Sequence, residues 1–149
     1  TGAEVTVGII GNLGNYTVLP IIEEDYSELP EGLPKICGYE AKWITDSPYM
    51  QKLKSIEANL PVPVEQELVS HSLKLFQRLE CKDYCRFDWR LKRLGEPKLL
   101  EVNPNPGWCW DSHMAKMSKI GGKDYPTMLK AILNAAEMRY RRMDEKRAT

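Results

Sequence analysis

Asp88, Glu101 and Asn103 carry the clearest chemical signal, because carboxylate and amide oxygens are the ligands that hard cations prefer. The three residues lie in two strand-like segments, 84–91 and 99–107, which are rich in β-branched, aromatic and aliphatic residues. Two carboxylates held side by side repel each other, and a cation between them removes that repulsion. Mg²⁺ in ATP-using sites is usually held by few protein oxygens, with room left for water and phosphate. The residues therefore predict a Mg²⁺ site, which Mn²⁺ would also suit.

The register of the predicted hairpin decides whether these side chains meet. A two-residue turn with Leu94 and Gly95 at its tip sets four pairs: Arg93 with Glu96, Leu91 with Lys98, Asp88 with Glu101, and Arg86 with Asn103. Because side chains alternate along a strand, the last two pairs share one face, with opposed Cβ atoms roughly 5 Å apart. A solvated hairpin face is the more common explanation of such charges. The stiff Pro-Asn-Pro-Gly segment after Asn103 fixes the amide and favours the metal site.

Several motifs together resemble the C-terminal part of D-alanine–D-alanine ligases, which belong to the ATP-grasp superfamily. The matching segments follow the order typical of that family and are 4–11, 39–42, 83–88 and 100–107, followed by Ser112 and His113. The resemblance covers residues from 2 to about 137. It implies that the chain is the C-terminal lobe of an ATP-grasp fold.

The resemblance also implies an activity. Such enzymes phosphorylate a carboxylate with Mg-ATP and then let an amine attack the acyl phosphate, so the expected partners are small-molecule carboxylate and amine substrates. The chain from Thr1 resembles only the C-terminal lobe, so we expect a fragment of a longer ligase that is inactive without the upstream ATP-grasp lobe. The alternatives are a non-catalytic lobe that binds a partner chain and a cation- or anion-binding domain unrelated to ligases.

The resemblance assigns roles to further charged residues. Lys42 would bind the γ-phosphate of ATP and neutralise the transferred phosphoryl group, while Arg86 would contact the acyl phosphate and the oxyanion of the tetrahedral intermediate. Glu4 would bind the ribose hydroxyls of ATP. Without the resemblance, Lys42 and Glu4 read as ordinary solvated charges. Arg86 would then be a cross-strand partner of Asp88 or Glu101.

Segment 107–113, Gly-Trp-Cys-Trp-Asp-Ser-His, is the most unusual stretch. By resemblance, Ser112 would bind the second amino-acid substrate, with Trp110 and Asp111 at the same pocket. Trp108, Trp110 and Asp111 depart from the small polar residues usual in D-alanine ligases, which would suit an amine other than D-alanine. The alternative is that one or both tryptophans are core anchors.

Strand and helix patterns predict how these residues are positioned. Strands are expected at 5–10 and 17–22, in a short extended segment at 38–44, and in the hairpin 84–103. Helices are expected from about Val64 to Leu79 and from about Tyr125 onward. Because strands and helices are segregated, the predicted class is α+β, an antiparallel sheet with helices packed on one side. One domain would span 1–149, with surface loops at 23–35 and 45–63 and a charged, exposed tail at 139–149.

Composition limits the classes of partner. The 149 residues, 42% hydrophobic and 28% charged, suit one globular domain. A net charge of zero gives no reason to expect nucleic acid or a membrane surface as partner. Four cysteines without a Cys-x-x-Cys pair argue against a zinc site and suit reduced thiols in a cytoplasmic protein. A homodimer stays open.

Overall fold

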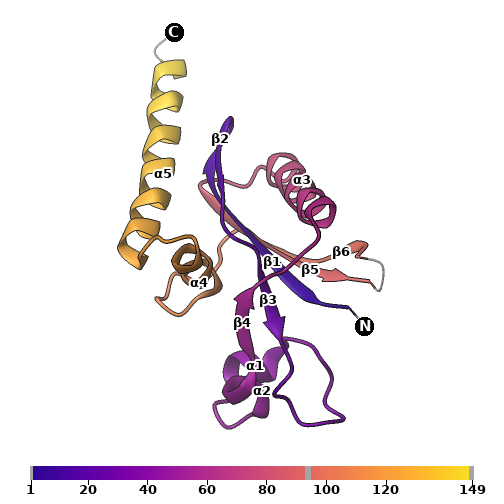
Figure 1. Cartoon of the computed structure of the whole chain (residues 1–149). Coiled ribbons are helices and arrows are strands. Elements are labelled where there is room, and N and C mark those ends of the chain that lie inside the picture. Colours follow the sequence, from indigo (N-terminus) through magenta and orange to yellow (C-terminus); the bar gives the residue numbers. More distant parts are fainter. Residues whose placement is uncertain (1, 93–94, 148–149) are drawn as a thin grey trace.

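A single antiparallel sheet forms the centre of the protein (Figure 1). The computed structural model describes residues 2–92 and 95–147, without the side chains of residues 42 and 43. The sheet order is β4-β3-β1-β5-β6, and β2 pairs with the end of β1. The strands are β1 (Glu4–Asn12), β2 (Asn15–Val18), β3 (Ile22–Asp25), β4 (Lys54–Glu57), β5 (Tyr84–Leu91) and β6 (Pro97–Asn103). The predicted antiparallel sheet is confirmed.

Helices flank this sheet, which confirms the α+β class. They are α1 (Tyr39–Trp43), α2 (Pro48–Lys52), α3 (Val62–Arg78), α4 (His113–Ile120) and α5 (Tyr125–Arg147). Figure 1 shows that they occupy both faces, with α3 on one side of the sheet and α4 and α5 on the other, rather than one side alone. None of the helices in residues 2–92 and 95–147 combines the length and apolarity needed to cross a membrane.

Alternation along β1 explains why both faces are covered. Every second side chain of segment 5–9 packs in one buried cluster with Leu68 and Phe76 of α3. The side chains between them point to the opposite face, where Ile10 packs in a second cluster with Met114 of α4. The sheet therefore separates two cores, and the even-numbered residues of β1 share a face with α4.

The hairpin of β5 and β6 has the register that the site requires. Asp88 lies opposite Glu101 and Arg86 lies opposite Asn103, which confirms these two predicted pairs. All four residues therefore belong to the face of the sheet that α4 also covers.

A β-bulge makes the rest of this hairpin differ from the prediction. Leu91 pairs with Pro97 instead of Lys98, and the register shifts between Asp88 and Trp89. Leu100 is the extra residue of β6, and its insertion restores the predicted pairing on the site side of the bulge. The predicted turn tip and the Arg93–Glu96 pair involve residues 93–94, which lie outside the described residues.

Two predicted segments change type. Segment 38–44 was expected to be extended but contains the short helix α1, in keeping with the helix propensity of its Glu-Ala-Lys core. The predicted loop 45–63 contains α2 and β4 and the start of α3. Ser47 caps α2 by accepting a hydrogen bond from the Met50 amide at 3.1 Å, and Pro48 occupies the first turn. That Ser-Pro start signal was present in the sequence.

Pro20 divides the predicted strand 17–22 into β2 and β3, because proline supplies no amide for the ladder. β3 extends to Asp25, so the predicted loop 23–35 begins as a strand. At the other end of the chain, α5 runs through most of the predicted tail, with exposed side chains from residue 141 to 147.

Candidate functional site

A cavity of about 210 Å³ lies on the α4 face of the sheet. Four residues singled out by the sequence line it, namely Glu4, Arg86, Asp88 and Glu101. Thr6, Glu24 and His113 also line it, although no site role was predicted for any of the three. β1, β3, β5, β6 and the first residue of α4 thus contribute polar side chains to one place.

Arg86 and Asp88 form the centre of this cavity. The Arg86 Nε donates to Asp88 Oδ1 at 3.0 Å and Nη2 donates to Oδ2 at 2.8 Å, so the ion pair is bidentate. Thr6 Oγ1 also donates to Asp88 Oδ1, at 2.9 Å. The side chain of Arg86 is only 10% exposed. A fixed guanidinium in a poorly hydrated place is suited to stabilising an anion.

Glu101 and Asn103 lie beside this pair on β6. Glu101 is exposed and lines the cavity, and within the described residues no ion pair to it is found. Asn103 is partly buried, and its Oδ1 accepts a hydrogen bond from the Asn105 amide at 3.0 Å, which orients the side chain. The predicted stiff segment after Asn103 thus holds the amide in place.

These residues fit a cation that brings its own ligands. Within residues 2–92 and 95–147, no cluster of three His, Cys, Asp or Glu side chains is arranged to hold a metal alone. Asp88 and Glu101 are opposed carboxylates on one face, and Asn103 adds a neutral oxygen on the same strand. Such a donor set suits Mg²⁺, which commonly keeps waters and substrate phosphates as further ligands.

Glu4 is buried rather than solvated. Its Oε2 accepts hydrogen bonds from the Tyr26 hydroxyl at 2.8 Å and from Arg90 Nη2 at 2.9 Å, and from the Cys37 amide at 3.3 Å. Burial, and then the neighbouring Glu4 carboxylate, raise the pKa of Tyr26 well above its ordinary value, so that its hydroxyl remains a donor. Glu4 thereby ties β1 to the segment that precedes α1.

A second line of hydrogen bonds approaches Arg86 from α4 and β3. Arg86 Nη1 lies 3.3 Å from His113 Nδ1, and His113 Nε2 lies 2.8 Å from Glu24 Oε1. Burial alone would raise the pKa of Glu24. The hydrogen bond from His113, with smaller contributions from Ser55 and Lys116, outweighs burial and lowers the Glu24 pKa below its ordinary value. Glu24 is thus kept as a charged acceptor.

Ser112, Trp110 and Asp111, the other predicted site residues whose side chains the structure describes, are not among the residues that line the cavity. The backbone of Lys42 lies in α1, and its side chain lies outside the described residues. Ser112 is the N-cap of α4, where its Oγ accepts a hydrogen bond from the Ala115 amide at 3.3 Å. Trp110, which is 76% exposed, and Asp111 lie at the surface just before this helix.

Trp108 is anchored, in contrast to Trp110. Its indole Nε1 donates to the Tyr84 hydroxyl, and its carbonyl accepts a hydrogen bond from the Tyr125 hydroxyl. Trp108 is nevertheless 49% exposed, so the expectation of a core anchor is wrong for both tryptophans, and Trp110 has the larger surface open to a ligand.

The sequence held weak signals for the three unexpected lining residues. Thr6 lies two residues after Glu4 on one strand, so the two share a face. Glu24 lies two residues after the buried Ile22 and shares its face of the strand, so its side chain is buried as well, but the acid-rich surroundings favoured a loop. His113 directly follows Ser112, whose capping role was not foreseen.

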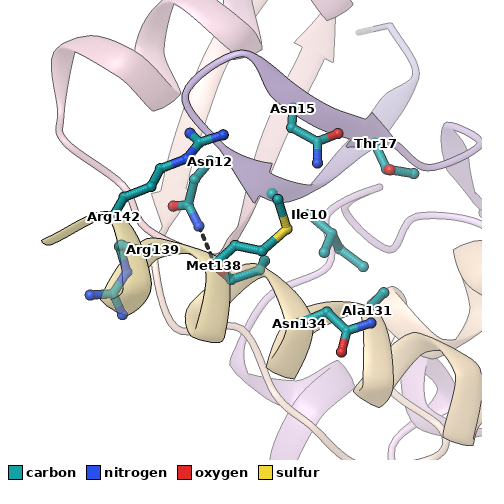
Figure 2. A pocket seen from close by; sticks show the side chains of 11 residues that line it. Ile10, Asn12, Asn15, Thr17, Ala131, Asn134, Met138, Arg139 and Arg142 are labelled. Atoms are coloured by element: carbon teal, nitrogen blue, oxygen red, sulfur yellow. Dashed lines mark hydrogen bonds between the residues drawn. The ribbon is translucent and has the colours of Figure 1, made fainter. Parts of the chain in front are cut away.

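A different cavity, of about 260 Å³, lies between the β1–β2 hairpin and α5 (Figure 2). Its cations have partners, since Arg139 pairs with Asp83 and Arg142 donates to the Leu13 carbonyl at 3.2 Å. Asn12 donates to the Ala135 carbonyl at 2.9 Å and thus links the hairpin to α5. Among the side chains that the structure describes, none of the predicted site residues lines this cavity.

Known proteins resemble the chain along nearly its whole length. An uncharacterized protein, y4sG, of Sinorhizobium fredii is 32% identical over 93% of the chain, and a D-alanine–D-alanine ligase of Albidiferax ferrireducens is 31% identical over 93%. The chain spans about two fifths of these relatives, namely 39% and 38% of their lengths.

Solved structures agree with this relationship. A D-alanine–D-alanine ligase from Bacillus anthracis matches with a TM-score of 0.71 at 26% identity, over 97% of the chain and 42% of that protein. Its structure complexed with ATP matches with a TM-score of 0.68 at 23% identity, over 96% of the chain and 39% of that protein. Residues 1–134 match the family described as D-ala D-ala ligase C-terminus. The chain therefore belongs to the D-alanine–D-alanine ligase C-terminal family.

Proposed function

We propose that the chain is the C-terminal lobe of an ATP-dependent carboxylate–amine ligase that forms an acyl phosphate with Mg-ATP. The observation that carries this proposal is the cavity in which Glu4, Arg86, Asp88 and Glu101 meet, within a chain of the ligase family. Because the chain spans about two fifths of its relatives, the ligase would be a longer protein with an upstream lobe. ATP and both substrates would lie between the two lobes.

Each residue then has a defined task. Asp88, Glu101 and Asn103 would hold Mg²⁺, which would supply neutralisation of phosphate charge. Arg86 faces the acyl phosphate and the oxyanion that forms when the amine attacks, and its fixed position means that little reorganisation is needed at that moment. Glu4, Lys42 and Ser112 are assigned to the ribose, the γ-phosphate and the amine substrate by family membership, and the cavity supports only Glu4 directly.

The test is a screen of ATP hydrolysis by the longer protein that carries this chain, against a panel of D- and L-amino acids and small amines. A ligase should hydrolyse ATP only with an acceptable pair of substrates, and mass spectrometry should find the amide product. ATP hydrolysis that is independent of every amine would contradict the proposal.

The chain of 149 residues alone is expected to bind ATP more weakly than about 1 mM, which corresponds to about −4 kcal/mol. One lobe offers half of a nucleotide cleft and leaves the other side in water. Isothermal titration calorimetry with Mg-ATP measures this. Binding at micromolar concentrations would show that the second lobe is not needed for the nucleotide.

Trp110→Ala in the longer protein is expected to raise the KM of the amine severalfold without changing the KM of ATP or the melting temperature. The indole is 76% exposed, so its loss removes little packing, whereas a substrate that rests on it would lose apolar contact. Trp108→Ala is the matched comparison, because it breaks the Tyr84 hydrogen bond and should lower the melting temperature. An unchanged amine KM in Trp110→Ala would remove this residue from the substrate site.

One observation favours the alternative of a non-catalytic lobe that binds a partner chain. Both Asp88 oxygens already accept hydrogen bonds, from Arg86 and Thr6, so this carboxylate is satisfied without a metal. A carboxylate oxygen can accept more than one bond, so this arrangement is also compatible with a metal ligand. A longer protein that binds a partner yet hydrolyses no ATP in the screen would favour the alternative.

A further inference from the structure

Arg86 is held from a second side by residues that the proposed reaction does not use. His113 is the first residue of α4 and Glu24 lies on β3, so two elements far apart in sequence form a line of contacts that ends at the guanidinium. His113 contacts Arg86 through Nδ1 at 3.3 Å and Glu24 through Nε2 at 2.8 Å. The Asp88 carboxylate occupies the other nitrogens of the guanidinium, Nε and Nη2.

The direction of these hydrogen bonds follows from the chemistry of the groups. A guanidinium only donates, so Arg86 Nη1 donates and His113 Nδ1 accepts with its lone pair. The proton of the ring then lies on Nε2, which donates to the Glu24 carboxylate. Glu24 thereby selects the tautomer that leaves an acceptor facing Arg86.

Glu24 is itself fixed. Its side chain is 4% exposed, and Ser55 Oγ lies 3.1 and 3.2 Å from its two oxygens. At the other end, Ser112 caps α4 and so sets the place of His113 at the first helical position. The ring can therefore turn little, and its acceptor stays directed at Arg86.

We propose that His113 is a positioning residue for Arg86, and that Glu24 holds it in the required tautomer. The inference rests on the proposed function, in which Arg86 must be in place before charge develops on the transferred group. His113 supplies the contact at Nη1 that Asp88 does not make. Asp88 on one side, and His113 with its partner Glu24 on the other, then fix the guanidinium of Arg86.

Two substitutions separate this role from a purely structural one. His113→Asn retains an acceptor near the position of Nδ1 but does not reach Glu24. His113→Gln reaches Glu24 but places no acceptor beside Arg86. In the longer protein, His113→Gln is expected to lower kcat about 10- to 100-fold with the KM of ATP unchanged, and His113→Asn is expected to retain clearly more activity. His71→Gln, at the half-exposed histidine of α3, is the control and should leave kcat unchanged.

A tie between α4 and β3 alone predicts the reverse order, because His113→Gln preserves that tie. Equal or greater activity in His113→Gln than in His113→Asn would therefore overturn the inference. So would an unchanged kcat in both variants. Melting temperatures show whether either variant has lost its fold. If one has, the kcat of the variant that still folds is compared with the wild-type kcat, and this comparison tests the inference.

The Arg86→Lys background separates the inference from the proposed function. If His113 acts through Arg86, His113→Gln should cost less than about twofold in that background. An equal loss in both backgrounds would reject the positioning role and leave the ligase proposal intact. Unchanged ligation by Arg86→Lys and Arg86→Ala would instead reject the role of Arg86 itself, and with it the proposed mechanism.

Discussion

Glu101→Gln in the longer protein is expected to lower ATP turnover by about 100-fold or more, equivalent to about 3 kcal/mol of lost transition-state stabilisation. The change removes one of two opposed carboxylates that are proposed to hold Mg²⁺, and it leaves the size and shape of the side chain nearly the same. Initial rates at several Mg²⁺ concentrations measure the effect. Higher Mg²⁺ should restore part of the activity, because the substitution weakens metal binding.

The fold should survive this substitution. Glu101 is exposed, and no ion pair to it exists among residues 2–92 and 95–147, so the melting temperature should change by little. Glu96→Gln, near the turn of the same hairpin, is the matched control. Its pairs with Lys92 and Lys98 are exposed and contribute little to stability, and it should retain full turnover. Normal turnover in Glu101→Gln would remove this residue from the metal site.

The hairpin that carries the proposed metal site was predictable because two independent signals agreed. Strand alternation and the Gly95 turn fixed which residues oppose one another, and the structure has Asp88 opposite Glu101 and Arg86 opposite Asn103. The agreement depended on a bulge at Leu100, which no local signal in the sequence announced. Without that extra residue, the pairing of Leu91 with Pro97 would carry through the hairpin and move the site residues out of register.

The contacts that Arg86 makes with α4 could not be predicted from the sequence, for a different reason. Asp88 is two residues away on the same strand, but His113 meets Arg86, and Glu24 meets His113, only because α4 packs on that face of the sheet. Helix α4 is short, and its start depends on the Ser112 cap, which resembled a substrate-binding residue in the sequence. Such contacts arise from tertiary packing, and periodicity carries no information about them.

The ends of strands β1, β2 and β3 also differ from the prediction. The strand expected at 17–22 breaks at Pro20, which supplies no amide for the ladder. The hairpin after β1 was expected to turn over six residues, 11–16, whereas β1 and β2 pair up to Asn12 and Asn15. The turn tip is therefore only Leu13 and Gly14, and Gly11 lies within the paired region.

Gly11→Ala is expected to destabilise the chain by about 3 kcal/mol or more, with a fall of about 10 °C in melting temperature. Gly11 has φ of +130°, which side-chain-bearing residues rarely adopt, and a Cβ added there would lie 2.0 Å from the carbonyl oxygen of Asn15. That oxygen belongs to the backbone of the paired strand, so relief requires the β1–β2 hairpin to open. Thermal unfolding followed by circular dichroism measures the loss.

Gly14→Ala is the matched control for this substitution, since both glycines lie in the same hairpin and both have positive φ. Gly14 has φ of +81°, but a Cβ added there meets nothing within 4 Å, so only backbone strain of about 1 kcal/mol is expected. The difference between the two variants therefore isolates the steric conflict with Asn15. Equal losses of stability would show that the hairpin relieves the contact with Asn15 without a free-energy cost. Backbone strain alone would then account for the effect of replacing either glycine. A larger loss at Gly11 would show that β1, the strand that carries Glu4 and Thr6 into the cavity, depends on close backbone approach at its far end.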